Sequence, residues 1–231
     1  MKPYRGIGME GMIARWYSSQ TKHALSDFEL LAQRVAEQIP ERAKVLEVAP
    51  GPGYFAVELA RLDDFEVTGL DISRTFIDIA RENARAAGVR IDFRHGSVSE
   101  MPFAADRFDF LLCRAAFKNF TEPVRALNEM YRVLKPGGKA WIIDLRREAS
   151  PQEINHAVDA MRLGGMNGII TKLTFRFMLL KRAYSKPEFE SLLAQTRFQS
   201  GEIRQDSIGF EAELTKSSSA EREYAESEPG A

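Results

Sequence analysis

The chain has 231 residues, 44% of them hydrophobic and 28% charged, with a formal net charge of −1. This composition is typical of a globular domain that buries a sizeable core, and the near-neutral charge gives no bulk reason to expect nucleic-acid binding. Its single cysteine, Cys113, excludes an internal disulfide and favours a reducing compartment. Because there is no apolar signal region at the N-terminus and no uncharged apolar run of roughly 18 residues, we expect a cytoplasmic protein.

The first forty residues precede the first predicted strand. Residues 1–23 show no periodic pattern and are expected to be irregular, whereas apolar positions from Ser26 repeat with helical spacing until Pro40. We expect residues 1–40 to form a helical lid segment beside the main domain.

Strands and helices alternate over the next hundred residues. Ser73 and Thr121 are predicted N-caps, and Gly88 suits the position after a helix. The predicted strands are 45–48, 65–70, 89–93, 108–113 and 139–145, and the predicted helices start at Tyr54, Ser73 and Thr121. This alternation indicates an α/β fold with a doubly wound parallel sheet and right-handed crossovers.

The pattern changes after Ser150. Ser150 and Glu153 form a capping box, and Ser185 and Glu188 form a second one. The predicted elements are a helical insertion at about 150–184, a helix from Ser185 to about Arg197, an antiparallel hairpin at 202–216 and a disordered acidic tail at 217–231. Residues 41–216 would then form the main domain.

The stretch Lys44–Ala56 joins a strand, a glycine loop and a helix, which is how an open α/β sheet builds a cofactor site. Gly51, Gly53 and Ala56 fit the G-x-G-x-x-A pattern of dinucleotide-binding proteins, and Asp71 lies at a suitable distance. A dinucleotide-dependent oxidoreductase is therefore the first alternative.

Two features of the same loop oppose a phosphate-bearing cofactor. A pyrophosphate needs free backbone N–H groups, and Pro50 and Pro52 remove two of them. Glu47 adds a carboxylate that would repel a phosphate. A cationic cofactor without phosphates, such as S-adenosylmethionine, meets neither objection.

Several blocks of the sequence resemble the class I, seven-strand S-adenosylmethionine-dependent methyltransferases, over roughly residues 14–145. Glu47–Gly53 resembles the family loop E-x-G-x-G-x-G, Asp71 matches the acidic residue that ends the second strand, and Leu134–Gly138 matches the L-K-P-G-G turn. Gly96–Phe103 resembles the G-D-A-x-x-L-P-F segment of the small-molecule methyltransferases of ubiquinone and menaquinone biosynthesis. The resemblance implies a Rossmann-like seven-strand sheet whose last strand is antiparallel.

The same resemblance implies a set of cofactor-binding residues. Asp71 would hold the ribose hydroxyls, and Tyr17 would belong to a segment that folds over the cofactor or the substrate. The full set is Tyr17, Glu47, Ala49, Pro50, Gly51, Gly53, Asp71, Ile72, Ser97, Val98 and Arg114. Ala49 replaces a family glycine, and we expect a negative φ there. Ser97 replaces the aspartate that receives the adenine amino group, and would accept that bond without charge assistance.

Residues after the fourth strand bear on the methyl acceptor. The resemblance implies that Arg114 and Lys118 lie beside the methyl-transfer cavity. Cys113–Phe117 lacks the Asn-Pro-Pro-Tyr type of motif that grips nucleobase amines, and Cys113 is expected to pack in the sheet. Asp144 alone is insufficient for Mg²⁺, so we expect no metal. No residue stands out as a general base, and we assign no catalytic residue.

We therefore expect methyl transfer from S-adenosylmethionine to a small, apolar or aromatic acceptor, with S-adenosylhomocysteine as product. The acceptor atom and the oligomeric state stay open, and a non-catalytic S-adenosylmethionine-binding protein is a second alternative. The basic, apolar segment 169–182 is interpreted as a lid helix, with a lipophilic pocket or a membrane-surface helix as alternatives. The histidines His23, His95 and His156 are expected to be structural or exposed.

Overall fold

The structure, a computed structural model, describes residues 8–21, 25–160, 168, 171–173, 175 and 179–218, except for the side chains of Gln20 and Ala160. Outside the described residues lie 169–170, 174 and 176–178 of the predicted lid helix at 169–182, as well as His23 and nearly all of the predicted tail. Within the described ranges, no helix has the length and apolar character needed to cross a membrane.

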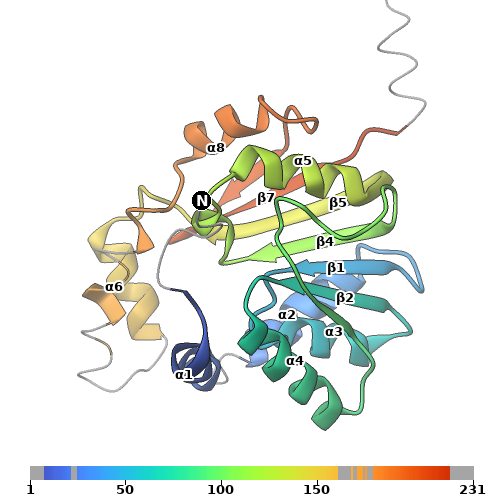
Figure 1. Cartoon of the computed structure of the whole chain (residues 1–231). Helices are drawn as coiled ribbons and strands as arrows, with labels where there is room; N and C mark the ends of the chain where they lie inside the picture. Colours follow the sequence, from blue (N-terminus) through green and yellow to red (C-terminus); the bar gives the residue numbers. More distant parts are fainter. Residues whose placement is uncertain are drawn as a thin grey trace, which may run out of the picture.

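A seven-strand sheet forms the centre of the chain (Figure 1), with the strand order β3-β2-β1-β4-β5-β7-β6. The strands are β1 (Lys44–Val48), β2 (Glu66–Asp71), β3 (Asp92–His95), β4 (Phe108–Arg114), β5 (Leu134–Leu145), β6 (Glu202–Gln205) and β7 (Gly209–Thr215). Strands β1 to β5 pair in parallel, whereas β7 pairs antiparallel with both β5 and β6. The predicted fold class, including the antiparallel last strand and the edge hairpin, is confirmed.

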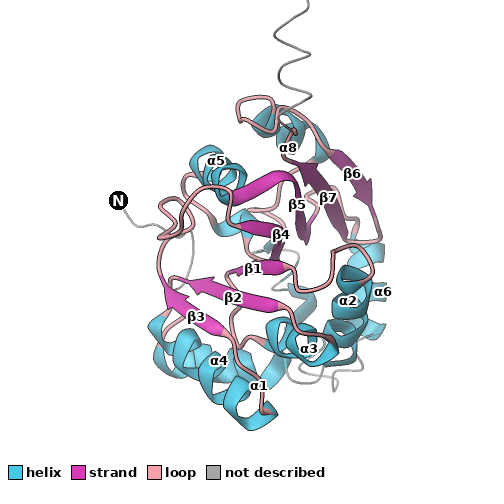
Figure 2. Ribbon diagram, turned by 90° about the vertical axis from the view of Figure 1, so that its right-hand side faces the viewer, coloured by secondary structure: helices cyan, strands magenta, loops and turns pink. Residues whose placement is uncertain are grey.

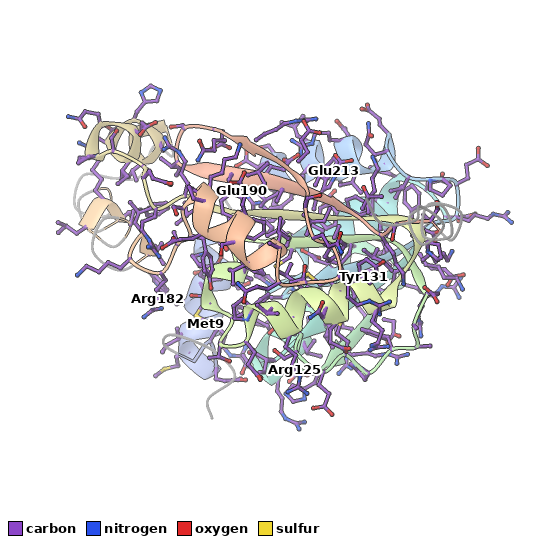
Figure 3. All side chains as sticks on the ribbon, turned by 90° about the horizontal axis from the view of Figure 1, so that it is seen from above. Met9, Arg125, Tyr131, Arg182, Glu190 and Glu213 are labelled. Atoms are coloured by element: carbon purple, nitrogen blue, oxygen red, sulfur yellow. The ribbon has the colours of Figure 1, made fainter. Side chains whose placement is uncertain are left out.

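Helices cover both faces of the sheet (Figure 2). They are α1 (Gly11–Thr21), α2 (Leu25–Ala36), α3 (Tyr54–Leu62), α4 (Arg74–Ala87), η2 (Phe117–Asn119, a short 3₁₀ helix), α5 (Pro123–Val133), α6 (Pro151–Ala160) and α8 (Lys186–Leu193). Helices α2, α3 and α4 lie on one face, and α5 and α8 lie on the other. Viewed from above, α5 lies along the sheet and carries both Arg125 and Tyr131 (Figure 3).

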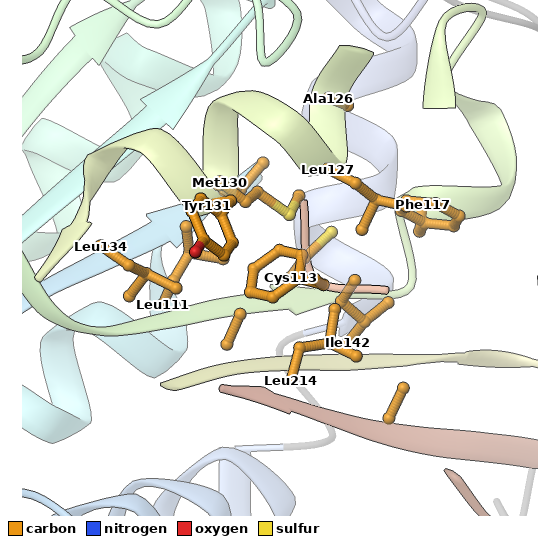
Figure 4. Packing of buried hydrophobic residues seen from close by; sticks show 14 of the residues in the cluster. Leu111, Cys113, Phe117, Ala126, Leu127, Met130, Tyr131, Leu134, Ile142 and Leu214 are labelled. Atoms are coloured by element: carbon orange, nitrogen blue, oxygen red, sulfur yellow. The ribbon is translucent and has the colours of Figure 1, made fainter. Parts of the chain in front are cut away.

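Each face of the sheet carries a large apolar cluster, because successive side chains of a strand point to opposite faces, and a smaller third cluster lies around α6. In β4, Leu111 and Cys113 belong to the cluster under α5, whereas Phe110 and Leu112 belong to the cluster under α2 and α3. Leu127 of α5 belongs to the first cluster (Figure 4). Cys113 is fully buried there, as predicted.

The prediction that residues 1–23 are irregular was wrong, since residues 11–21 form α1. This helix has little apolar periodicity of its own and is held by distant contacts. Ala14 is fully buried, and the ring of Tyr17 packs edge-on against Phe76, with 5.9 Å between the centroids. Tertiary packing thus decides the structure of this segment.

Three predicted boundaries also differ. The third strand starts at Asp92 rather than at residue 89, because the N–H of Val89 still closes α4 through a hydrogen bond to Ala84 O (3.1 Å). The N-cap of α5 is Glu122 and not Thr121. Helix α8 ends at Leu193, well before Arg197. Both predicted capping boxes are present.

Gly69 lets β2 pass close to the neighbouring strand and loop. A Cβ atom at this position would lie 2.5 Å from Phe93 Cδ1 and 3.2 Å from Pro50 Cγ. Because Phe93 is buried, we expect Gly69→Ala to lower the free energy of unfolding by about 2–3 kcal/mol, measured by urea denaturation. Gly8→Ala, with no heavy atom within 4 Å of its Cβ position, is the control. An unchanged stability of Gly69→Ala would contradict this close packing.

Candidate functional site

The candidate site lies at the carboxyl ends of the central strands. Strand β1 continues into α3 on one face of the sheet, whereas β4 leads to α5 on the opposite face. This divergence is a topological switch point, where open α/β sheets bind ligands. The residues predicted from the family pattern follow four neighbouring strands: Glu47, Ala49, Pro50, Gly51 and Gly53 at β1, Asp71 and Ile72 at β2, Ser97 and Val98 at β3, and Arg114 at β4.

Glu47 is a buried carboxyl group near the end of β1, with 4% of its surface exposed. Its Oε2 accepts a hydrogen bond from the backbone N–H of Ala56 in α3 (3.2 Å). Burial raises the pKa of Glu47 to about 8, although the Ala56 bond and the positive charge of Arg114 oppose the shift. Glu47 is therefore mostly protonated at neutral pH and would ionise beside a cation.

Asp71 is the second buried carboxyl group and ends β2. Its Oδ2 accepts the N–H of Gly51 (3.1 Å), and its Oδ1 accepts the N–H of Ser73 (2.8 Å). Burial raises the pKa of Asp71 to about 6, against these two hydrogen bonds. Each carboxylate oxygen keeps a free lone pair, so the group can also accept bonds from two hydroxyls of a ligand.

The loop between these carboxyls turns through a left-handed backbone. Ala49, Gly51 and Gly53 have φ values of 54°, 54° and 76°. The expectation of a negative φ at Ala49 was therefore wrong, because its N–H donates to Leu70 O of β2 (2.8 Å) while the chain turns away from β1. The glycine that the family carries at this position was the feature of the sequence that could have indicated a positive φ. Alanine adopts the same conformation at a cost of roughly 1–2 kcal/mol.

Helix α1 lies across the starts of α3 and α4. The hydroxyl of Tyr54 donates to Ser18 O (3.0 Å), and Tyr17 packs against Phe76. Burial raises the pKa of Tyr17, whereas the charge of Arg114 lowers it. The structure therefore places the predicted residue Tyr17 against the start of α4, within the influence of the charge of Arg114.

Glu10, which our sequence analysis missed, attaches this segment to α4. Its carboxylate accepts the N–H groups of Arg74 (3.0 Å) and Thr75 (3.1 Å), and Ser73 Oγ donates to Met9 O (2.6 Å). Partial burial opposes ionisation, but the hydrogen bonds hold the pKa of Glu10 below its ordinary value. Because 64 residues separate Glu10 from Arg74, no local pattern could reveal this contact.

The β3 side of the site contains no buried carboxylate among the predicted residues. Ser97 Oγ accepts the N–H of Ser99 (3.2 Å), and Val98 packs against the core. The Nε2 atom of His95 lies 3.1 Å from Ile72 O, and this histidine is exposed, as is His156. In the part of the chain that the structure describes, no group of three or more His, Cys, Asp or Glu residues could hold a metal ion.

Arg114 ends β4 and Lys118 follows it in η2, and the two side chains differ in environment. The Arg114 guanidinium lies over the ring of Phe28, with 4.5 Å from Cζ to the centroid. Lys118 is buried in an ion pair with Asp144, with 2.8 Å between Nζ and Oδ1. The Lys118 ammonium is therefore held by a fixed partner, whereas the positive charge of Arg114 acts on Glu47 and lowers its pKa.

Comparison with known proteins identifies the family of the chain. A family model described as a methyltransferase domain matches residues 46–142. A demethylmenaquinone methyltransferase of Deinococcus radiodurans is 33% identical over 137 residues, which are 59% of this chain and 51% of the relative. A second one, of Chlorobaculum parvum, is 30% identical over 166 residues, 69% of this chain and 67% of the relative. The chain belongs to the class I methyltransferase family.

The matched part of this class I methyltransferase spans about half the length of the first relative and two thirds of the length of the second. Its fold is also similar to that of a Methanococcus maripaludis protein provisionally described as an S-adenosyl-L-methionine-dependent methyltransferase. The TM-score is 0.74 at 20% identity, covering 92% of this chain and 96% of the other. S-adenosylmethionine is the cofactor of the family, and two buried carboxyl groups beside a proline-containing loop fit its positive charge and its ribose.

Glu47→Gln tests the burial of this carboxyl group. The pKa of Glu47 is about 8 in the fold and near 4.5 in the unfolded chain, so its contribution to stability is complete below about pH 4.5 and is lost as the pH rises to about 8. We therefore expect the free energy of unfolding of the ligand-free variant to increase relative to that of the wild type as the pH rises, by up to about 4 kcal/mol at pH 8.5. Denaturant unfolding at pH 5 and pH 8.5 measures this difference. A difference independent of pH would contradict the raised pKa.

Proposed function

We propose that this chain transfers a methyl group from S-adenosylmethionine to a small, quinone-like acceptor. The observation that carries the proposal is the pair of buried carboxyl groups, Glu47 and Asp71, at the ends of adjacent strands. Buried carboxyls favour a cationic or hydroxyl-rich ligand and disfavour a phosphate. The family relation supports the same reading, and no finding supports the dinucleotide-dependent oxidoreductase.

In this proposal the cofactor lies across the carboxyl edge from β4 to β3. Asp71 accepts the ribose hydroxyls, and Ile72, Ser97 and Val98 surround the base. The amino-acid end lies towards β1 and β4. Here Glu47 and Arg114 provide opposite charges, the turn from Ala49 to Gly53 provides the backbone, and Tyr17 covers the site from α1.

When bound, the sulfonium supplies an electrophilic methyl group for in-line displacement by the acceptor. The contribution of this chain is positioning and exclusion of water, which can supply much of the rate. Helix α1 packs against α4 and the start of α3, and its Tyr17 is half-buried beside Phe76. Lys118 cannot readily act as a base because its ammonium is paired with Asp144.

The names of the curated relatives guide the choice of acceptor. The Deinococcus radiodurans and Chlorobaculum parvum relatives are demethylmenaquinone methyltransferases, so a reduced quinone is the first acceptor to test. We further propose a cytoplasmic location, in keeping with the single, buried Cys113. The division into a lid at 1–40, a main domain at 41–216, an insertion at about 150–184 and a tail at 217–231 is likewise a proposal.

A ligand comparison followed by an activity assay tests the proposed function. S-adenosylhomocysteine should raise the melting temperature of the protein, whereas NADH should leave it unchanged. With methyl-labelled S-adenosylmethionine and reduced demethylmenaquinone, label should enter the quinone. Stabilisation by NADH alone would overturn the proposal, and binding of S-adenosylhomocysteine without transfer to quinones, phenols, thiols or amines would favour the non-catalytic alternative.

Asp71→Ala tests the proposed ribose contact. Removing an ionised acceptor of hydroxyl bonds should weaken binding of S-adenosylhomocysteine by about 1.5–3 kcal/mol, roughly 10- to 150-fold in Kd, measured by calorimetry. Asp64→Ala is a matched control, because Asp64 is exposed and follows α3 away from the site. Thermal unfolding of each variant checks the fold. Unchanged affinity in Asp71→Ala would remove Asp71 from the site.

A further inference from the structure

A buried ion pair joins the ends of β4 and β5 beside the proposed cofactor site. The side chains of Lys118 and Asp144 are only 5% and 1% exposed. Such a pair is a weak source of stability, because removing two charges from water costs about as much as their attraction returns. The location of this pair therefore calls for an explanation other than the stability of the fold.

The pair ties three backbone positions together. Asp144 Oδ2 accepts the N–H of Lys118 (2.9 Å), and Asp144 Oδ1 accepts the N–H of Leu145 (2.8 Å). Lys118 Nζ also donates to the carbonyl oxygen of Ala115 (2.6 Å). The pair thus connects the turn after β4 to the last residues of β5.

The held turn has an unfavourable backbone conformation. Ala115 has a φ of 57°, and its N–H donates to Ile143 O (2.7 Å). A left-handed alanine persists only where its surroundings enforce it. The bonds from Lys118 and to Ile143 supply that restraint. They fix the direction in which the chain leaves β4, immediately after Arg114.

The Arg114 guanidinium is able to bind an anion. Its guanidinium is half-buried over Phe28, and within the described ranges no carboxylate lies at ion-pair distance from it. Glu47 of β1 lies opposite Leu112 of the paired strand β4, two residues before Arg114, and the charge of Arg114 lowers the pKa of Glu47. A group able to bind a cation and a group able to bind an anion are therefore neighbours at the ends of β1 and β4.

We propose that the Lys118–Asp144 pair is a positioning device that directs Arg114 to the carboxylate at the amino-acid end of the cofactor, beside Glu47. Glu47 takes the ammonium group of the same amino acid. An α-amino acid carries both charges on one carbon, so adjacent groups of opposite charge fit it, and a guanidinium can bind its carboxylate through two bonds. This inference rests on the proposed function.

Two ligands that differ only at the amino-acid end provide the test. S-adenosylhomocysteine contains the amino acid, whereas 5′-methylthioadenosine has the same adenosine and thioether without it. In the double variant Lys118→Met/Asp144→Asn no unpaired charge stays buried, and the asparagine oxygen can still accept a backbone N–H. We expect calorimetry to show at least 10-fold weaker binding of S-adenosylhomocysteine, with 5′-methylthioadenosine changed less than 2-fold. Arg114→Met should show the same selective loss.

A second ion pair of the same sheet provides the matched control. Lys139 of β5 pairs with Glu213 of β7, with 2.5 Å between Nζ and Oε1. Lys139 lies near the other end of β5 from Asp144, and Glu213 is opposite Trp141. Lys139→Met/Glu213→Gln should leave the affinities for both ligands unchanged. Equal weakening of both ligands in the Lys118/Asp144 variant, or no weakening of S-adenosylhomocysteine, would overturn the positioning role.

Ala115→Gly serves if the double variant does not fold. Glycine accepts a φ of 57° but is free to leave it, so the restraint on Arg114 is relaxed while the ion pair stays. We expect 3-fold or greater weakening of S-adenosylhomocysteine, and no change for 5′-methylthioadenosine. Equal effects on the two ligands would overturn the inference. If the wild-type protein binds neither ligand, the proposed function is overturned together with the inference. Failure of the inference alone is recognised by normal binding in the wild type.

Discussion

The burial of two carboxyl groups at adjacent strand ends is the constraint around which the site is organised. Glu47 and Asp71 are each almost fully removed from water, which disfavours their charged forms. The backbone around them compensates in part, because Ala56, Gly51 and Ser73 donate N–H groups to them. In this way backbone N–H groups that could have held a phosphate donate to carboxyl groups instead, and a cationic ligand would favour the ionised form of these groups.

The turns after β1 and β4 share one backbone geometry. Each begins with an alanine in the left-handed region, Ala49 after β1 and Ala115 after the last residue of β4. In both cases the alanine N–H is hydrogen-bonded to a neighbouring strand, to Leu70 O and to Ile143 O. The chain therefore turns sharply while the sheet stays hydrogen-bonded to its edge. Strain of this kind is common where backbone direction matters for binding.

Much of the fold could be predicted from the sequence, because its signals are local. Buried strands such as Lys44–Val48 read as continuous apolar runs, and the Ser73 cap with Gly88 marks α4 at both ends. The acidic residues of the candidate site were predicted from their spacing, their chemistry and the resemblance to the family. What escaped prediction depends on distant contacts or on backbone angles. The φ of Ala49 follows from a bond to the next strand, and the Lys118–Asp144 pair forms across 26 residues.

The hydrogen bonds from the start of α4 to Glu10 determine when the N-terminal segment can join the folded domain. Helix α4 starts three residues after Asp71, the last residue of β2, and its first N–H groups are satisfied by a carboxylate from outside the helix. During synthesis Glu10 emerges long before Thr75, so its partner does not exist when the segment first leaves the ribosome. The N-terminal segment can therefore take its place only after β1, α3 and β2 have been made, which makes α1 a late-docking part of the domain itself.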